Sequence, residues 1–288
     1  MEAFNSIKKE LKTYTEKKLR EAKKKHFQVL ELLESAYCFI GDEAHHSSSA
    51  TWYDTLMLCK NAVYRIGLTG TVDKEDVTNY MRLMGCTGDI LTKISNEFLI
   101  EQGFSAKPTI HLATIKQPSL PGNLTWQQAY KAGVVENEFR NELIAEQVLD
   151  RYSKGDGCLV IVNHLAHGEL LEKLFEDRGI EYEFTHGSFD GRERVLADMK
   201  TGKLKVLIAT SILDEGIDIS GINSLWLASG GKSYRQVLQR IGRGLRKKAD
   251  GSGLTVYDFL DYTQVHLTKH TAKRYQYYKD ENFEVKRI

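Results

Sequence analysis

The sequence predicts an α/β protein whose strands form parallel sheets. Short apolar segments alternate with longer helical segments along most of the chain, a pattern typical of strands buried between two layers of helices. Polar side chains follow several apolar segments directly, and ligands bind at the carboxyl ends of strands in such sheets. Hydrophobic residues make up 41% of the 288 residues, an ordinary share for a globular protein. We therefore expect a packed core with functional residues at the strand ends.

The N-terminal part begins with a lysine-rich helical pattern that extends to about Ser35. Two apolar segments follow, and we expect them to form strands at 36–41 and 63–68. Helices are expected near 50–60 and 75–84, so that strand and helix alternate here as well.

The three prolines of the chain lie close together, at Pro108, Pro118 and Pro121. Because proline interrupts regular structure, we interpret residues 107–123 as an irregular linker. This linker divides the chain into an N-terminal domain at 1–106 and a C-terminal domain at 124–288.

The C-terminal domain alternates strand and helix more regularly than the N-terminal one. It opens with a long helix at about 125–152. Strands are expected at 158–163, 182–185, 205–210, 224–228 and 254–259. Helices are expected between and after them, near 167–178, 191–200, 233–246 and 264–278.

Composition excludes several other classes of protein. No apolar run reaches the roughly 18 residues of a membrane-spanning helix, and the N-terminal lysines do not form a signal peptide. We therefore expect a cytoplasmic protein with no membrane partner.

The four cysteines form no C-x-x-C pair and are typical of thiols in a reducing compartment. The net charge of +1 is the sum of two basic segments, 8–26 and 231–250, and an acidic remainder. Basic segments of this kind can bind a polyanion, although segment 8–26 can alternatively be the solvated face of a helix.

The first chemical motif is Asp42-Glu43-Ala44-His45, directly after an apolar strand. A carboxylate at this position can reach a Mg²⁺ ion bound to nucleotide phosphates, and the adjacent Glu43 can polarise an attacking water. Two solvated acids at the end of a strand are the alternative interpretation. The next strand ends in Leu68-Thr69-Gly70-Thr71, whose two hydroxyls can hydrogen-bond such carboxylates; alone, this is a common turn.

The third motif is the segment I-A-T-S-I-L-D-E-G-I-D-I at 208–219. Its strand would deliver the hydroxyls of Thr210 and Ser211 to a nucleic-acid phosphate. Gly216 permits close backbone approach, and Asp218 is an acceptor suited to a ribose hydroxyl.

The fourth motif lies on the helix expected near 233–246. Gln239, Arg243 and Arg246 are four and then three residues apart, so they share one helix face. Arginines arranged in this way suit a γ-phosphate, whose transition-state charge they neutralise. A basic surface helix is the alternative.

Taken in order and with their separations, these four motifs resemble motifs II to VI of the superfamily 2 DEAD/DEAH-box helicases. The similarity covers nearly all of residues 36–288 and is greatest to the phage UvsW-type DNA repair and recombination helicases. The narrower match is supported by N-H-L-A-H-G at 163–168, S-G-G-K-S at 229–233 and V-Y-D-F at 256–259. The resemblance implies tandem RecA-like parallel sheets, with the first domain truncated and the second, helicase C-terminal domain nearly complete.

The resemblance also implies a role for each matching residue, with ATP and Mg²⁺ as cofactors and single-stranded or branched DNA as partner. Asp42 would contact Mg²⁺, Glu43 would be the catalytic base, and Arg243 and Arg246 would be catalytic arginine fingers. Nucleotide-binding roles fall to Gly216, Asp218 and Gln239, and coupling roles to Thr69 and Thr71. Nucleic-acid-binding roles fall to Thr210, Ser211, His186, Gly187 and His164; for the two histidines, packing in a loop is an equal alternative.

One element of the family is missing from the sequence. A superfamily 2 helicase has a phosphate-binding loop, G-x-x-x-x-G-K-[ST], upstream of motif II. The only Gly-Lys-Ser here is Gly231-Lys232-Ser233, and Trp226 stands where the first glycine belongs. A parallel sheet without its first strands exposes an apolar edge. We therefore expect either a second polypeptide to supply this half or the chain to be a truncated product.

Three functions follow from this combination of features. The chain is part of an ATP-dependent DNA helicase or translocase of repair, recombination or replication, without ATPase activity when alone. It is alternatively a non-catalytic nucleic-acid-binding helicase remnant, or a remnant that docks on a partner. The expected location is the cytoplasm of a bacterial or phage-infected host cell.

Overall fold

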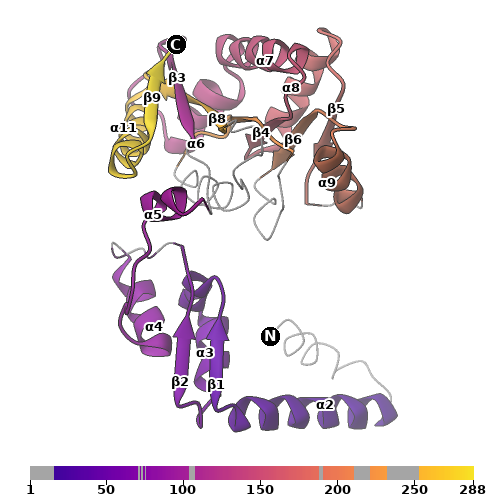
Figure 1. Cartoon of the computed structure of the whole chain (residues 1–288), viewed down its shortest axis with the longest axis vertical. Coiled ribbons are helices and arrows are strands. Elements are labelled where there is room, and N and C mark those ends of the chain that lie inside the picture. The colour runs from indigo at the N-terminus through magenta and orange to yellow at the C-terminus, as the bar shows by residue number, and fades with distance from the viewer. Residues whose placement is uncertain are drawn as a thin grey trace. The chain divides into compact units, whose positions relative to one another are not determined.

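The computed structural model describes residues 16–70, 72, 74, 76–103, 108–187, 191–210, 221–231 and 253–288. The chain forms two compact units, Met1–Lys93 and Ile94–Ile288 (Figure 1). Each unit contains a sheet of parallel strands with helices, so the predicted α/β class is confirmed. No helix among the described residues is long and apolar enough to cross a membrane.

Unit 1 contains a two-stranded parallel sheet. Its elements are α2 (Glu16–Ser35), β1 (Cys38–Gly41), the short 3-10 helix η1 (Ala44–Ser48), α3 (Ala50–Met57), β2 (Tyr64–Gly67) and α4 (Val77–Thr87). The strands are in register from Cys38 opposite Tyr64 to Gly41 opposite Gly67. They therefore end together, and the residues that follow them lie at the same edge of the sheet.

The helices of unit 1 begin where the sequence offers capping side chains. The Ser49 side chain accepts a hydrogen bond from the Trp52 N–H at the start of α3, and Asp76 does the same for Asn79 at the start of α4. The apolar residues of the strands are only partly covered, because Ile40 and Tyr64 remain 63% and 55% exposed.

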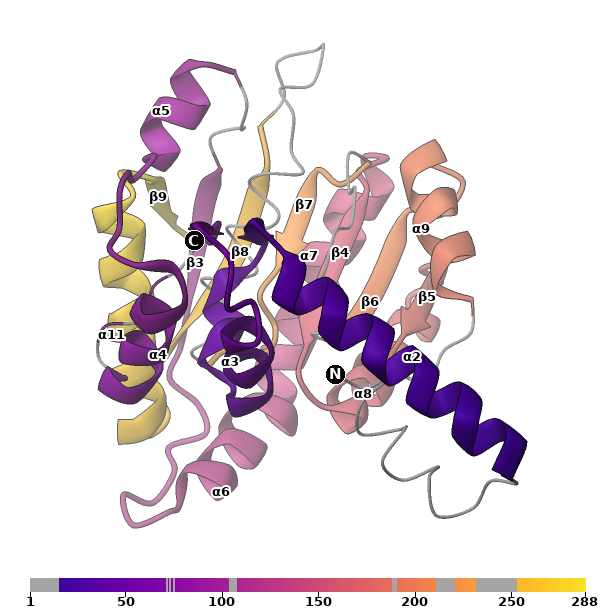
Figure 2. The same cartoon turned by 90° about the horizontal axis from the view of Figure 1, so that it is seen from below.

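Unit 2 contains a seven-stranded sheet in which every pair of neighbours is parallel. Its strands are β3 (Thr109–Ile115), β4 (Cys158–Val162), β5 (Tyr182–Thr185), β6 (Val206–Thr210), β7 (Ser224–Trp226), β8 (Thr255–Asp261) and β9 (Glu284–Arg287). They lie in the order β5-β6-β4-β7-β8-β3-β9, which runs from right to left in Figure 2.

Helices cover both faces of this sheet. The described helices of unit 2 are α5 (Asn96–Glu101), α6 (Trp126–Tyr130), the π-helix η2 (Lys131–Val135), α7 (Glu138–Ser153), α8 (Leu165–Glu176), α9 (Arg192–Thr201) and α11 (Val265–Asp280). α7 and α8 pack on one face, around Val160 and Phe259, while α9 and α11 pack on the other, around Leu159 and Ile161. Successive strand residues alternate between the two cores, as the pleat of a strand requires.

Four elements differ from those expected from the sequence. Residues 109–115, assigned there to an irregular linker, form β3 inside the sheet, because the apolar alternation of this segment outweighs the prolines on either side. The single helix expected at 125–152 is divided into α6, η2 and α7, with Asn137 capping the last of them. The strand β9 and the short helix α5 were not expected. The helix expected near 233–246 lies outside the described residues.

The turn before β4 provides a test of the packing. A Cβ atom added to Gly157 would lie 2.1 Å from the carbonyl oxygen of Gly221, which is backbone and cannot move aside. We expect Gly157→Ala to lower the free energy of unfolding by about 1–3 kcal/mol through overpacking. Gly122→Ala is the control, because nothing lies within 4 Å of its added Cβ. Urea unfolding followed by circular dichroism measures both variants, and equal midpoints for the two would contradict the close approach.

Candidate functional site

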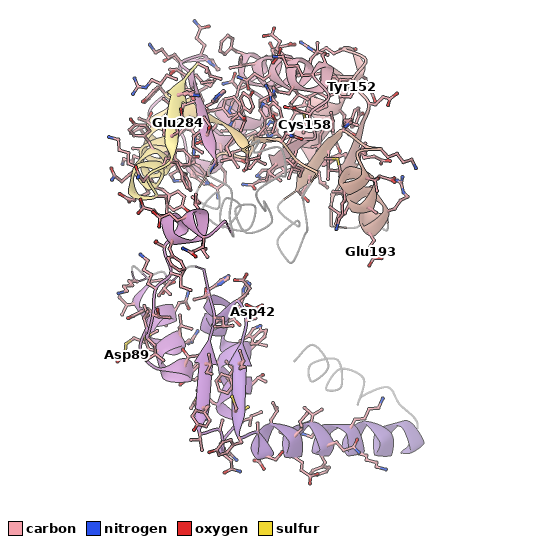
Figure 3. All side chains as sticks on the ribbon, viewed as in Figure 1. Asp42, Asp89, Tyr152, Cys158, Glu193 and Glu284 are labelled. Carbon is pink, nitrogen blue, oxygen red and sulfur yellow. The ribbon has the colours of Figure 1, made fainter. Side chains whose placement is uncertain are left out.

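The acidic motif of unit 1 directly follows β1, and Figure 3 labels Asp42 there. The Asp42 side chain is exposed, and its Oδ1 accepts a hydrogen bond from the Glu43 N–H at 2.9 Å. Glu43 has a backbone φ of 49° and ψ of 45°, the left-handed conformation. This conformation costs a non-glycine residue about 1–2 kcal/mol. Such strain persists only where the surroundings hold it, and it is concentrated at functional sites.

His45 connects the two motifs of unit 1. Its Nδ1 lies 3.0 Å from Thr69 Oγ1 and 3.3 Å from Glu43 Oε2. The backbone reinforces this arrangement, because the Ala44 N–H donates to the Leu68 carbonyl at 2.9 Å. The structure thus brings Glu43 and Thr69 to one histidine at the ends of β1 and β2. Thr71 lies outside the described residues.

The side chains at the ends of β1 and β2 can supply only part of a magnesium site. No group of three or more His, Cys, Asp or Glu side chains within the described part of the chain is arranged to hold a metal ion. Mg²⁺ at nucleotide sites, however, is held by one or two carboxylates together with substrate phosphates. The exposed Asp42 carboxylate fits that requirement. His45 belongs to the D-E-A-H string, but the sequence analysis gave it no role.

In unit 2, the predicted nucleic-acid residues lie at the carboxyl edge of three adjacent strands. Val162, at the end of β4, is opposite Thr210, at the end of β6, and β5 pairs with the other side of β6. His164 follows β4, and His186 and Gly187 follow β5. The structure therefore brings these four predicted residues to the same edge: Thr210, His164, His186 and Gly187.

Two features of this edge suit an anion. α8 begins at Leu165 with His164 as its N-cap, so its N-terminal N–H groups lie beside the end of β4. Thr210 is buried, and its Oγ1 has no hydrogen-bond partner among the described residues. Ser211, Gly216, Asp218, Gln239, Arg243 and Arg246 all lie outside those residues.

The loop after β7 is held at the same edge. The Ser229 N–H donates to the Ile161 carbonyl at 2.8 Å, which joins the loop to β4. The Tyr130 hydroxyl donates to the Ser229 carbonyl at 2.5 Å, and Arg140 Nη1 donates to the Ala228 carbonyl at 2.8 Å. These contacts fix the segment that leads into the predicted arginine row.

A cluster of buried ion pairs contacts this loop through Arg140. Arg140 Nε donates to Asp261 Oδ1 at 3.1 Å, while Arg274 contacts Asp258 at 2.8 Å and Asp261 at 3.4 Å. Burial raises the pKa of Asp261, and the two guanidinium groups oppose that rise. Sequence reasoning missed this cluster, although two aspartates inside the apolar segment V-Y-D-F-L-D were a usable signal, because buried carboxylates require partners.

Two family models match the chain. Residues 140–248 match the helicase conserved C-terminal domain, and residues 2–74 match the res subunit of type III restriction enzymes. The ATP-dependent DNA helicase UvsW of Enterobacteria phage T4 is 26% identical over 269 residues, covering 85% of this chain and 53% of the phage protein. The chain thus spans about half the length of this relative.

Solved structures show the same fold. The crystal structure of T4 UvsW aligns with a TM-score of 0.50 and 23% identity, over 90% of this chain and 55% of that one. Saccharomyces cerevisiae Dbp5 bound to RNA and ADP BeF3 aligns with a TM-score of 0.57 and 17% identity, over 90% of this chain and 63% of that one. The two parallel sheets match the RecA-like domains of helicases, as the motifs predicted.

A buried histidine near the edge of unit 2 makes stability depend on pH. His167 Nε2 lies 2.9 Å from Asn141 Oδ1, and burial lowers the pKa of His167 to about 3. Between that value and its ordinary pKa near 6.5, the unfolded chain binds a proton that the folded chain does not. The free energy of unfolding should therefore fall as pH decreases below 6.5, by about 1 kcal/mol per pH unit from this group.

We expect His167→Gln to flatten this pH dependence, whatever its effect on stability at pH 7. Urea unfolding between pH 4.5 and about 7.5, the range in which a histidine titrates, measures the slope. His266→Gln makes the same substitution at a partly exposed histidine and serves as the control. An unchanged slope in His167→Gln would mean that this histidine is not held neutral by the fold.

Proposed function

Because this chain resembles superfamily 2 helicases of the UvsW type, we propose that it is the motif II to motif VI part of an ATP-dependent DNA helicase or translocase. The proposed activity serves DNA repair, recombination or replication in the cytoplasm of a bacterial or phage-infected cell. The observation that carries the proposal is the contact of His45 with both Glu43 and Thr69. A module that only binds nucleic acid has no need for a strained glutamate joined to a second strand end.

At the nucleotide, each proposed role follows from the chemistry of a side chain. Asp42 would hold Mg²⁺, which would neutralise charge on the nucleotide phosphates. Glu43 accepts a proton from the attacking water, and His45 orients the Glu43 carboxylate through its 3.3 Å contact. Nucleotide contacts are proposed for Gly216, Asp218 and Gln239, and Arg243 and Arg246 are the proposed arginine fingers.

Thr69 and Thr71 are proposed to couple the nucleotide site to the strand-binding surface. The support for this comes from Thr69, whose hydroxyl is 3.0 Å from the same histidine nitrogen that contacts Glu43. A change at the Glu43 carboxylate alters the hydrogen bonds available to His45 and thereby to Thr69. The end of β1 and the end of β2 then respond together.

Single-stranded or branched DNA is the proposed partner at the carboxyl edge of unit 2. The N-terminus of α8 and the buried Thr210 hydroxyl offer N–H and O–H donors to a backbone phosphate. The remaining proposed contacts come from Ser211, His164, His186 and Gly187.

We also propose that a second polypeptide segment supplies the phosphate-binding half of the nucleotide site. No G-x-x-x-x-G-K-[ST] loop occurs in the 288 residues. Parallel sheets normally have both faces covered, yet Ile40, Tyr64 and Ile66 on the two strands of unit 1 are exposed. An added strand and helix would bury these side chains.

The isolated chain should hydrolyse ATP negligibly, with or without single-stranded DNA, because the phosphates lack their main cradle. Release of phosphate from ATP measures this. Substantial DNA-stimulated hydrolysis that Glu43→Gln abolishes, and that the exposed helix variant Glu31→Gln retains, would contradict the need for a second segment. Absence of hydrolysis together with a partner that fails to restore it would favour a non-catalytic remnant.

DNA binding should weaken steeply as salt increases, because contacts with phosphates release counterions. Thr210→Val removes one hydroxyl without changing shape or charge, so we expect roughly tenfold weaker binding with the same salt slope. Thr201→Val is the matched control, because that threonine is exposed at the end of α9. Fluorescence anisotropy with a labelled oligonucleotide measures both, and equal affinity of the two variants would exclude Thr210 from the interface.

A further inference from the structure

Tyr130 lies between the end of β4, where the proposed function places nucleic acid, and the loop after β7, which precedes the proposed arginine fingers in the sequence. It is the last residue of α6, and its side chain is buried. Its hydroxyl donates to the Ser229 carbonyl at 2.5 Å. Its ring centroid is 5.3 Å from that of His164. One side chain therefore contacts both the β4–α8 junction and the loop after β7.

The first of these contacts lies at the proposed nucleic-acid edge. Asn163 and His164 are exposed and directly precede α8, whose N-terminus is the proposed phosphate site. A nucleic-acid strand bound there would meet the exposed His164 side chain, which itself contacts the Tyr130 ring.

The second contact lies in the segment that precedes the arginine row in the sequence. Ser229 begins the segment S-G-G-K-S, which precedes Gln239, Arg243 and Arg246 in the sequence. Gly230 and Gly231 have backbone φ values of 55° and 81°, a conformation that side-chain-bearing residues rarely adopt. A Cβ on Gly231 would lie 4.0 Å from Asn163 Nδ2, so the loop also passes close to the β4–α8 junction.

The tyrosine is held firmly in this position. The Trp126 ring centroid is 5.4 Å from that of Tyr130. Trp126 also packs against His270 of α11, with ring centroids 4.1 Å apart. Burial raises the pKa of Tyr130 to about 12, so the hydroxyl remains a hydrogen-bond donor at neutral pH. The helix changes to π geometry immediately afterwards, at Lys131–Val135, a form common at functional sites.

We propose that Tyr130 is a positioning residue that transmits nucleic-acid binding at His164 to the Ser229–Gly231 loop, which precedes the arginine row in the sequence. The inference rests on the proposed function for the roles of the two ends. A purely structural tyrosine would stabilise the loop equally with and without nucleic acid. The loop has independent support, because the Ser229 N–H donates to the Ile161 carbonyl, so removal of the hydroxyl alone leaves the loop attached to β4.

The test compares glycine amide signals in the full chain during titration with single-stranded oligo-dT. Glycine labelled with ¹⁵N reports Gly187 at the nucleic-acid edge and Gly230 and Gly231 in the loop. In the wild type, all three amides should shift. In Tyr130→Phe, Gly187 should still shift, while the shifts of Gly230 and Gly231 should fall by about half or more, as expected for a lost coupling. The affinity should stay within about threefold, because no phosphate contact is removed.

Tyr182→Phe is the matched control, because Tyr182 is partly buried and its hydroxyl donates to Glu176 at 2.9 Å, at the amino end of β5 and outside the cluster that holds the loop. Its three signals should respond as in the wild type. His164→Ala removes the ring contact on the other side of the link at an exposed position and should reduce the same two loop shifts, so the test does not depend on the folding of Tyr130→Phe.

The outcomes separate the inference from its premise. Full loop shifts in Tyr130→Phe and His164→Ala would overturn the inference, as would wild-type DNA binding that leaves Gly230 and Gly231 unmoved; both results preserve the proposed function. A wild-type chain that fails to bind oligo-dT at low salt would overturn both.

Discussion

The carboxyl end of the seven-stranded sheet depends on one buried carboxylate. Asp261, at the end of β8, contacts Arg140 of α7 and Arg274 of α11, and these two helices pack on opposite faces of the sheet. A single side chain therefore connects both helical layers at the edge where the functional residues gather. Removal of one member of such a buried cluster costs about 3–5 kcal/mol, because the remaining charge is left unpaired. The loop after β7 depends on it too, because Arg140 also donates to the Ala228 carbonyl.

Most of this sheet could be predicted from the sequence, because its strands are apolar on both faces. Tyr182–Thr185 forms β5 with the predicted bounds, and β4 and β6 each differ by one residue at one end. Residues 109–115 were assigned to a linker because prolines flank them. Their alternating apolar and polar side chains nevertheless form a strand, because the segment pairs with β8. The division of the helix at 125–152 depends on a tertiary contact, since a Cβ on Gly133 would lie 2.4 Å from Leu267 of α11.

Candidate site residues could be identified from the sequence only where a motif is contiguous. Asp42, Glu43 and Thr69 belong to short motifs that directly follow apolar segments, and the parallel register explains why Glu43 and Thr69 meet at His45. Tyr130 and Arg140 carry no local signal, because their roles come from partners about 90 to 120 residues away in the chain. Residue spacing on one helix or strand cannot reveal such partners. The paired aspartates of β8 were visible, but their arginines could be identified only after the helices were placed on the sheet.

The two units hold their functional residues by different means, and the difference follows from the number of strands. Unit 1 has two four-residue strands, and few of its side chains are buried. The strain of Glu43 is therefore opposed mainly by local hydrogen bonds, from its own N–H, from the Ala44 N–H and between His45 and Thr69. Covering Ile40, Tyr64 and Ile66 would stabilise the strands that present these groups, so a partner on that face would act on the carboxylate pair without contacting it.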